Sequence, residues 1–372
     1  MSKNVLITGG AGFVGAHLAN ELIEHGYKVH LFDALLSQVH GAHNKWPAYL
    51  DPSIELIYGN ICDPGAVRRA CRHMDIVYHL AARVGVGQSM YEVSRYTETN
   101  NGGTAVLMEE LIQRPVGCLV VASSMSIYGE GLYRRRNGET VSGQTRSLAQ
   151  LQAGQWDLMD EAGEPLQPIP TTEDKRPELA SVYALSKYDQ ERMCMIIGNA
   201  YQIPTVALRF FNIYGSLQAL SNPYTGVLAI FASRLLNNTP PLIYEDGYQR
   251  RDFVHVHDIA RACRLAAETP EAAHQVFNIG SGQVFTIREL AARLSTVLNK
   301  EELVPEITGK YRVGDIRHCF ADISRAQQVL GYQPTVTLAE GLRELTSWLK
   351  EQKAVDPVAD AEAELVSRGL IV

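Results

Sequence analysis

The stretch Asn4-Val5-Leu6-Ile7-Thr8-Gly9-Gly10-Ala11-Gly12-Phe13-Val14-Gly15 decides the fold of this chain. An apolar run of strand length meets glycines spaced G-x-x-G-x-x-G, and apolar residues at helical spacing follow. The pattern predicts a strand, a tight turn and a helix. One glycine makes the turn, one lets the backbone approach a pyrophosphate, and one lets the helix pack on the strand. Because N–H groups at the helix start would face phosphate oxygens, the stretch indicates a dinucleotide-binding fold.

A second strand indicates which dinucleotide binds. Gly26 lies where the C-cap of the first helix belongs, and the strand Val29–Phe32 ends at Asp33, close to where this fingerprint places an acidic residue. Asp33 would accept hydrogen bonds from the ribose hydroxyls and would repel a 2′-phosphate. We therefore expect NAD rather than NADP. The alternative is a glycine-rich hairpin followed by a solvated aspartate.

The composition predicts a soluble globular protein, and the length predicts one large domain with an appended smaller one, or two domains. The chain has 372 residues, of which 46% are hydrophobic and 20% are charged. The formal net charge of −7 argues against general nucleic-acid binding, which needs a basic surface. An anionic substrate must therefore be held by locally placed arginines.

The ends and the cysteines favour a cytoplasmic protein. The sequence starts directly with the predicted core strand, and no apolar run is long enough to cross a bilayer, so we expect no membrane partner. The six cysteines contain no C-x-x-C pair. Reduced thiols are therefore expected in place of disulfides or a zinc site.

Strands alternate with helices through the first half of the chain. Further strands are expected at Glu55–Tyr58, Asp75–Leu80, Cys118–Ala122 and Thr205–Phe210. The alternation predicts an α/β fold of Rossmann type, in which helices cover both faces of a doubly wound parallel sheet. We expect this domain over residues 1–210. A smaller mixed α/β region, partly interleaved with it, is expected over residues 211–353, and a tail over residues 354–372.

Residues 130–179 break the alternation. The segment contains Arg134-Arg135-Arg136, many Gly, Gln and Pro residues, and no sustained period. A loop of this length inside a compact domain is usually functional or disordered. We interpret it as an insertion near the mouth of the substrate site, and the arginine run as a solvated patch.

Two histidine pairs raise the question of a metal site. His40 and His43 lie in a polar segment, and His255 and His257 flank Val256. Since the sequence offers neither pair a nearby third ligand, we expect no metal. Asp63 has two open interpretations, because it follows a strand and precedes Pro64. It lies near the adenine edge of a dinucleotide, or it caps the next helix.

Two separated stretches carry the predicted chemistry. Ala122–Gly129 leaves the carboxyl end of a strand, where open α/β sheets bind ligands, and contains Ser124. Tyr183-Ala184-Leu185-Ser186-Lys187 opens an amphipathic helix and places Tyr183 and Lys187 on one face. A free tyrosine, with a pKa of about 10, is a poor base at neutral pH. The ammonium of Lys187 and the positive charge of an oxidised nicotinamide would favour the phenolate, while Ser124 would hydrogen-bond the same substrate oxygen. Alone, such a helix-face pair would usually be structural.

Together these stretches resemble the extended short-chain dehydrogenase/reductase family of nucleotide-sugar enzymes. The match runs from Asn4 to about Tyr332. Besides the stretches quoted above, it includes His79–Ala82, Asn100–Thr104, Leu208–Gly215, Arg251–Val256 and Arg312–Asp315.

The resemblance implies roles for individual residues. It implies a catalytic triad of Ser124, Tyr183 and Lys187, a nucleotide-sugar substrate bound by residues 211–353, and a homodimer formed through two helices of each subunit, one carrying Tyr183. The implied NAD-binding residues are Gly9, Gly12, Phe13, Val14, Gly15, Asp33, Ile61, Asp63, Leu80, Ala81, Ala82, Asn100, Tyr183 and Lys187. The implied substrate-binding residues are Arg83, Ser124, Ser126, Asn212, Arg251 and Arg312. Arginine guanidinium groups suit this role because they fork onto phosphate oxygens.

The residues after Ser124 narrow the reaction. In this family the 4,6-dehydratases carry an Asp-Glu pair there and the decarboxylases a glutamate, whereas this chain has Met125 and Ser126, which cannot shuttle a proton as a carboxyl does. We therefore expect 4-epimerisation: the Tyr183 phenolate takes the C4 hydroxyl proton as hydride passes to NAD, the 4-keto sugar turns over, and hydride returns to its other face. A 4,6-dehydratase, a 4-ketoreductase and a non-catalytic NAD-binding regulator remain alternatives.

The insertion gives a clue to the substrate. Its segments Tyr133–Arg146, Leu151–Trp156 and Pro168–Glu173 are similar to the insertion of dTDP-L-rhamnose 4-epimerases, and so is the terminal stretch Glu364–Leu370. Those proteins carry a cysteine pair between the tryptophan and the prolines, where this chain has none. The resemblance thus implies dTDP-L-rhamnose as a candidate substrate.

Overall fold

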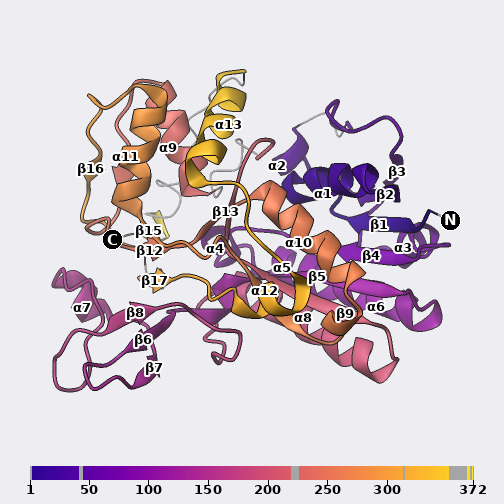
Figure 1. Cartoon of the computed structure of the whole chain (residues 1–372), viewed down its shortest axis with the longest axis horizontal. Coiled ribbons are helices and arrows are strands. Elements are labelled where there is room, and N and C mark those ends of the chain that lie inside the picture. The colour runs from indigo at the N-terminus through magenta and orange to yellow at the C-terminus, as the bar shows by residue number, and fades with distance from the viewer. Residues whose placement is uncertain are drawn as a thin grey trace.

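A parallel sheet forms the centre of the computed structural model, which describes residues 2–41, 45–218, 226–312, 315–351, 367–368 and 371. It has seven strands in the order β14-β9-β5-β4-β1-β2-β3 (Figure 1). The strands are β1 (Asn4–Thr8), β2 (Lys28–Asp33), β3 (Glu55–Tyr58), β4 (Ile76–His79), β5 (Cys118–Ser124), β9 (Thr205–Phe210) and β14 (Val276–Ile279). The predicted Rossmann-type α/β fold is confirmed, and each expected strand lies within two residues of its predicted bounds.

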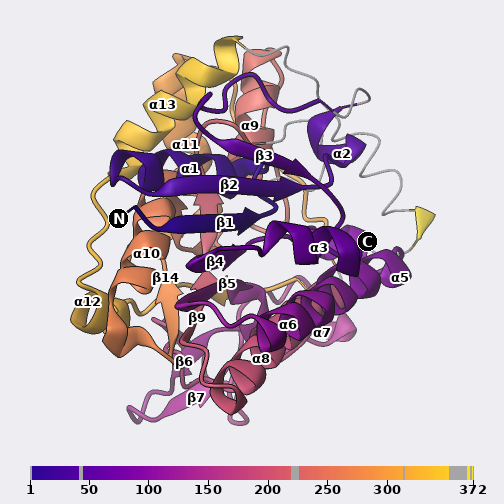
Figure 2. The ribbon, with the colours of Figure 1, turned by 90° about the vertical axis from the view of Figure 1, so that its right-hand side faces the viewer.

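Helices cover both faces of this sheet. On one face α1 (Phe13–Glu24) packs against α10 (Val256–Glu268), and on the other α3 (Pro64–Ala70), α6 (Gly103–Gln113) and α8 (Val182–Ala200) lie together (Figure 2). Each face has its own buried apolar cluster, so the strands are apolar on both sides, as a doubly covered parallel sheet requires. In the register, Thr8 lies opposite both Phe32 and His79, which gathers the carboxyl ends of β1, β2 and β4 at one edge.

The seventh strand was not predicted. β14 comes from the region 211–353, yet it pairs in parallel with β9, and α10 from the same region packs on α1. The two predicted regions therefore interleave in one sheet-and-helix body.

A second apolar core lies beside the sheet. It is built by α9 (Val227–Leu236), α11 (Ile287–Leu298) and α13 (Leu338–Glu351), which stand together in Figure 1. Thr286 and Glu289 form a reciprocal capping box at the start of α11, as their spacing predicts. The region also contains short strands in small separate sheets: β10 (Asn212–Tyr214) with β13 (Phe253–His255), β11 (Leu242–Ile243) with β16 (Glu306–Ile307), and β12 (Arg250–Arg251) with β15 (Phe285–Thr286) and β17 (His318–Cys319).

The insertion has a fold of its own. β6 (Leu132–Arg134) pairs antiparallel with β7 (Thr140–Ser142) and β8 (Gln167–Ile169), and α7 (Leu148–Gln152) lies between β7 and β8 in the chain (Figure 1, lower left). Within the arginine run, Arg135 forms an ion pair with Glu161 at 2.6 Å and Arg136 lies 3.6 Å from Glu164. These pairs lie at the surface, as predicted for a solvated patch.

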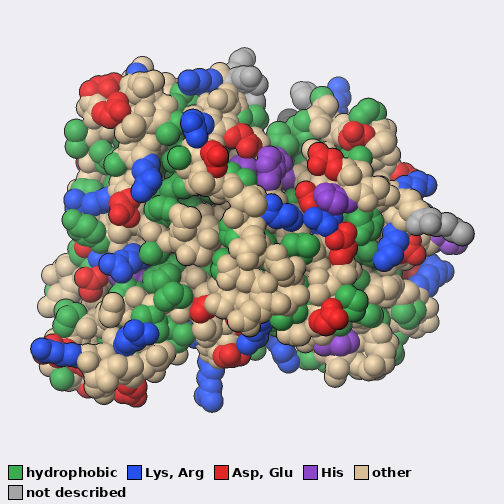
Figure 3. All heavy atoms as spheres, viewed as in Figure 1, with side chains coloured by type: hydrophobic (Ala, Val, Ile, Leu, Met, Phe, Trp, Pro, Cys, Tyr) green, Lys and Arg blue, Asp and Glu red, His purple; other side chains and the backbone are tan. Residues whose placement is uncertain are grey.

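The remaining short helices are α2 (Ser37–His40), α4 (Val86–Ser89), α5 (Val93–Tyr96), the π-helix η1 (Thr97–Gly102), the 3₁₀ helices η2 (Met125–Tyr128) and η3 (Pro270–Ala272), and α12 (Ser324–Leu330). In the described ranges, no helix combines the length and the apolar character that crossing a membrane demands. All six cysteines are unpaired, as predicted. Lys/Arg and Asp/Glu side chains are interspersed over the face shown in Figure 3. His43, Val313, Gly314 and most of the tail 354–372 lie outside the described residues.

Candidate active site

The glycine turn is shaped for close approach of a ligand. Gly9 has φ +68°, and a Cβ there would lie 2.9 Å from the backbone of Ala81. A Cβ on Gly15 would lie 2.6 Å from the carbonyl oxygen of Gly10, so α1 could not pack at this distance. Gly12 caps α1 without a side-chain hydrogen bond. The first N–H groups of α1 therefore keep the capacity to bind an anion, which fits the pyrophosphate of NAD. Phe13 and Val14 form the first turn of this helix.

Asp33 is held in place by the backbone. Its carboxylate accepts hydrogen bonds from the N–H of Ala11 at 3.1 Å and of Leu35 at 2.8 Å, which fixes it at the end of β2. A cavity of about 650 Å³ adjoins it, lined by Ala34, Leu35, Leu36, Ser37, Tyr58, Gly59, Asn60, Asp63, Ala66 and Arg69. The cavity lies where the adenosine half of NAD would bind in a fold of this type.

Asp63 caps a helix and also lines the cavity next to Asp33. Its side chain accepts from the N–H of Gly65 at 2.8 Å and so caps α3. It also lines the cavity beside Asp33. The side chain of Ile61, by contrast, is buried in the apolar core beneath Gly103, so only its backbone remains available to a ligand.

The loop after β4 lies directly over the glycine turn. The N–H of Leu80 donates to the carbonyl oxygen of Thr8 at 3.1 Å, and the N–H of Ala81 donates to the Thr8 hydroxyl at 3.2 Å. Ala82 follows, and its small side chain leaves room at this edge of the sheet. The loop thus closes one side of the predicted cofactor groove.

Asn100 joins this loop to the helix that carries Tyr183. Its amide oxygen accepts from the N–H of Arg83 at 2.7 Å, and its amide nitrogen donates to the Arg83 carbonyl at 3.1 Å and to the Ser186 hydroxyl at 2.9 Å. The residue is fully buried. Since these bonds use the side chain of Asn100 within the protein, its direct task here is to fix loop and helix together. The guanidinium of Arg83 contacts Thr99 at 3.3 Å.

Ser124 and Tyr183 meet where β5 ends and α8 begins. Ser181 caps α8 by accepting from the N–H of Ala184 at 3.1 Å, which directs the first turn of the helix toward the sheet edge. The Ser124 hydroxyl accepts from the hydroxyl of Ser126 at 2.9 Å and from its N–H at 3.2 Å. Its own proton is then left for a further acceptor, and it hydrogen-bonds the Tyr183 phenol. Three predicted site residues are therefore brought together.

Burial sets the protonation of the tyrosine and the lysine. It raises the pKa of Tyr183, and the hydrogen bond from Ser124 partly opposes this rise. Burial also lowers the pKa of Lys187, one turn further along α8, to about 8. Lys187 still carries its charge at neutral pH and lies on the same face of α8 as Tyr183. The positive charge of an oxidised nicotinamide would act in the same direction.

The predicted diphosphate residues lie on or near the short strands beside the second apolar core. Arg251 donates to the carbonyl oxygens of Ile316 and Arg317 and lies 3.9 Å from the Asp315 carboxylate. Arg312 is exposed, and its guanidinium stacks 4.9 Å above the ring of Tyr244. At the start of β10, the buried amide oxygen of Asn212 has no hydrogen-bond partner among the described residues. This oxygen is available to a ligand, whereas Arg251 is oriented by backbone carbonyls.

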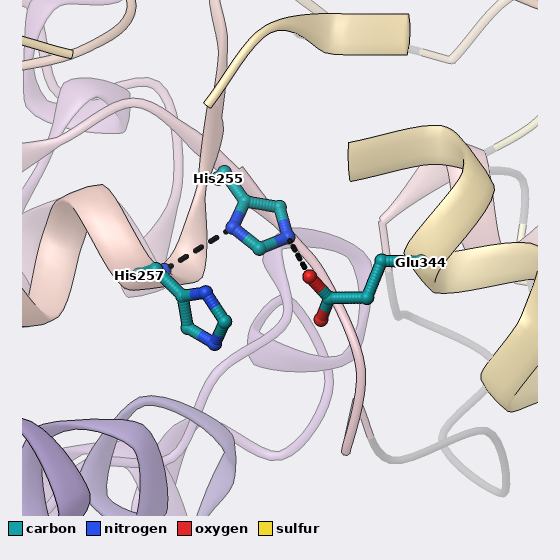
Figure 4. A group of neighbouring side chains, drawn as sticks. All are labelled: His255, His257 and Glu344. Atoms are coloured by element: carbon teal, nitrogen blue, oxygen red, sulfur yellow. Dashed lines mark hydrogen bonds and ion pairs between the residues drawn. The ribbon is translucent and has the colours of Figure 1, made fainter. Parts of the chain in front are cut away.

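A histidine cluster differs from its prediction. The sequence offers His255 and His257 no nearby third ligand, but α13 brings Glu344 to 3.3 Å from His255 (Figure 4). That premise was wrong, because the third group comes from a helix distant in the sequence. Nδ1 of His255 accepts from the N–H of His257 and caps α10, while Glu344 also accepts from the Ser216 hydroxyl at 2.7 Å. These bonds account for the cluster as a link between α10 and α13. His40 of the other pair lies 3.8 Å from Asp33.

Sequence reasoning missed the partners of Lys187. Its ammonium donates to Gln190 at 2.8 Å, and the amide of Gln190 contacts Thr104 and lies beside His79. The signal was present, because Gln190 follows Lys187 by three residues on a predicted helix and must lie next to it. The contacts with His79 and Thr104 had no such signal, since they join distant parts of the chain.

Comparisons with known proteins identify the family of this chain. The pattern of the NAD dependent epimerase/dehydratase family matches residues 5–150 and 159–280. A dTDP-L-rhamnose 4-epimerase from Burkholderia thailandensis is 34% identical over 94% of this chain and 96% of its own length. A putative UDP-glucose 4-epimerase from Methanocaldococcus jannaschii is 28% identical over 93% of this chain and 98% of its own.

Solved structures show the same fold. The UDP-glucose 4-epimerase of Thermotoga maritima, solved with UDP-glucose, superposes with a TM-score of 0.77 at 30% identity and covers 94% of this chain and 99% of that one. The UDP-glucuronic acid 4-epimerase of Bacillus cereus, solved with UDP-glucuronic acid and NAD, gives 0.77 at 26% identity over 94% and 99%. By its family match, its relatives and its glycine turn, the chain belongs to the NAD dependent epimerase/dehydratase family and is an NAD-dependent enzyme of the nucleotide-sugar epimerase type.

Proposed function

We propose that this enzyme is a nucleotide-sugar 4-epimerase and that its substrate is dTDP-L-rhamnose. The observation that carries the reaction is the hydrogen-bonded pair of Ser124 and Tyr183 with Lys187 one turn away, next to Met125 and Ser126 in place of carboxylic acids. The substrate rests on the insertion and on the relative from Burkholderia thailandensis that bears this activity in its name.

Each residue of the triad has one task in the proposed reaction. Tyr183 accepts the proton of the C4 hydroxyl through its phenolate oxygen and later returns it. Ser124 donates to the same sugar oxygen, because the two bonds from Ser126 occupy its acceptor side. Lys187 keeps its charge below pH of about 8 and so stabilises the phenolate. NAD, when bound, supplies a hydride acceptor and donor and is restored within one turnover.

The absence of a carboxyl beside Ser124 favours epimerisation over water loss. Elimination of water from C5 and C6 requires a group that takes one proton and gives another. Met125 has no exchangeable proton, and the hydroxyl of Ser126 is engaged with Ser124 at 2.9 Å. The sequence after β5 therefore supports a reaction confined to C4.

Residues beside the second apolar core are assigned to the diphosphate in this proposal. Arg312 presents an exposed guanidinium, and Asn212 presents a buried amide oxygen without a partner in the described residues. Arg251 lies on β12, with Asp315 close by. We assign Arg251 and Arg312 to the phosphate charges, which the net charge of −7 leaves to local cations.

A homodimer through α8 is part of this proposal. Leu185 and Ile196 on this helix are 46% and 55% exposed, although both are large apolar side chains. A second copy of the helix would cover them. Light scattering coupled to size exclusion tests the point, and Ile196→Glu should shift the protein toward monomer.

The test of function is a substrate panel. Purified protein is incubated with dTDP-L-rhamnose, UDP-glucose and UDP-N-acetylglucosamine without added cofactor, and the sugar ring is followed by proton NMR. A C4-inverted product from dTDP-L-rhamnose alone supports the proposal. Accumulation of a 4-keto product indicates a dehydratase, and turnover only after NADPH is added indicates a ketoreductase. Bound NAD without any turnover indicates a regulatory protein.

A further inference from the structure

Among the described residues, the ammonium of Lys187 has one hydrogen-bond partner. Its Nζ donates to Oε1 of Gln190 at 2.8 Å. Lys187 is 3% exposed and Gln190 is fully buried. A buried ammonium needs an acceptor to keep its charge, and Gln190 supplies it here, while the nearby Glu191 also favours the charged form.

A chain of hydrogen bonds behind Gln190 has a fixed direction. The N–H of Ala81 donates to the Thr8 hydroxyl, which contacts Nδ1 of His79 at 2.8 Å. Nε2 of His79 contacts the Thr104 hydroxyl at 2.9 Å, and that hydroxyl donates to the carbonyl of Asn100 at 2.5 Å. Since the proton of Thr104 is used, His79 must donate from Nε2 and accept at Nδ1. Burial lowers the pKa of His79 to about 3, so the ring is neutral and carries only this one proton.

This direction fixes the orientation of the Gln190 amide. Nε2 of Gln190 lies 2.9 Å from the Thr104 hydroxyl and 3.3 Å from the Ala81 carbonyl, and both accept. The His79 nitrogen at 3.2 Å carries a proton and cannot accept. A flipped amide would place its oxygen on the lone pairs of Thr104 and its NH₂ group against the ammonium of Lys187. Oε1 is therefore held toward Lys187.

We propose that Gln190 is a positioning residue that holds the ammonium of Lys187 beside Tyr183. The inference rests on the proposed function, because it concerns the lysine of the proposed triad. A neutral acceptor suits this task, since it stabilises the ammonium without cancelling its positive charge. A carboxylate in the same place would bind the ammonium more tightly and weaken its effect on the tyrosine.

Two substitutions test whether Gln190 positions Lys187 or only fills space in the core. One should move the acid limb and the other the alkaline limb of turnover plotted against pH. Gln190→Glu adds a negative charge near the triad and should raise the pH of half-maximal turnover on the acid side by about one unit. Gln190→Leu removes the acceptor, so Lys187 loses its proton at lower pH and the alkaline limb moves down, with kcat lowered roughly tenfold. Gln113→Glu, exposed at the far end of α6, is the matched control and should leave both limbs in place.

The readouts keep this inference separate from the proposed function. Turnover on the substrate found by NMR gives the pH profile. The ultraviolet absorbance of phenolate follows the ionisation of Tyr183 in NAD-loaded protein without turnover. The Tyr183 signal is obtained by subtracting the absorbance of the same Gln190 form that also carries Tyr183→Phe. An acid limb that moves up in Gln190→Glu, together with an alkaline limb that moves down in Gln190→Leu, supports the positioning role. Unshifted limbs and an unshifted phenolate titration overturn it, even where kcat falls. If Gln190→Leu does not fold, the acid-side shift of Gln190→Glu decides alone.

Discussion

Replacing Tyr183 with phenylalanine removes one oxygen and leaves the ring in place. The edge-to-face contact of this ring with Tyr96, at 6.5 Å between centroids, stays available to phenylalanine. The groups that hold NAD lie elsewhere, in the glycine turn and at Asp33. We therefore expect the substitution to remove the base and to leave the fold and the cofactor site intact.

The expected magnitude follows from these contacts. A positioned general base contributes roughly 10²- to 10⁴-fold, so kcat should fall by that factor, or about 3 to 5 kcal/mol in the barrier. The free energy of unfolding should change by about 1 kcal/mol or less, because the lost hydrogen bond joins Tyr183 to Ser124 at a site that is partly exposed. The effect on catalysis should thus exceed the effect on stability several-fold.

The assay measures turnover and cofactor content on the same samples. Proton NMR follows the C4 position of the sugar, and chromatography of the denatured protein gives the NAD retained per chain. Tyr201→Phe is the matched control, since it makes the same change at the exposed end of α8. Wild-type turnover in Tyr183→Phe with NAD bound would refute the assignment of the base. Loss of NAD together with turnover would show that the tyrosine holds the cofactor instead.

Three further predictions follow from the same contacts. Asp33→Ser should weaken NAD retention and allow NADP to bind, because the acceptor of the ribose hydroxyls and its negative charge are both lost; cofactor fluorescence titrations measure this. Wild-type turnover should decline as the pH rises through about 8, where Lys187 loses its proton, and Lys187→Arg should move the decline to higher pH in the NMR assay. Arg209→Met should cost about 3 to 5 kcal/mol in urea unfolding, because it leaves Glu191, now paired at 2.7 Å, as a buried uncompensated charge; Arg209→Met with Glu191→Leu should cost less.

The local parts of the site could be predicted from the sequence. The turn at Gly9 needs a positive φ and close backbone contacts, and the spacing of the glycines predicts such a turn. Tyr183 and Lys187 share a helix face because four residues make about one turn. In each case the interacting groups are neighbours in the chain.

Features that join distant residues could not be predicted in this way. β14 is four residues long, and only its pairing with β9 makes it part of the sheet. Glu344 reaches His255 because α13 packs beside β13, which no local pattern indicates. The direction of the hydrogen bonds around Gln190 depends on Thr8 in strand β1 and on Thr104 in helix α6. Such contacts appear only once the strands have been assembled.

One such long-range chain of contacts joins the insertion to residues 315–318. Buried Glu130 at its start accepts from the N–H groups of Arg317 and His318. Within the insertion, Arg146 forms an ion pair with Glu245 at 2.8 Å, and the guanidinium of Arg317 contacts the same Glu245 at 3.0 Å.

The backbone carbonyl of Arg317 is also an acceptor for Arg251, at 2.9 Å. The insertion is therefore fixed to the same short segment that orients the arginine predicted to bind the diphosphate. A change that loosens Glu130 would release both N–H groups of that segment and, with them, the carbonyls on which Arg251 depends. Because removing one partner of a buried charge network leaves the others without compensation, we expect the insertion and the predicted diphosphate site to be coupled in stability as well as in position.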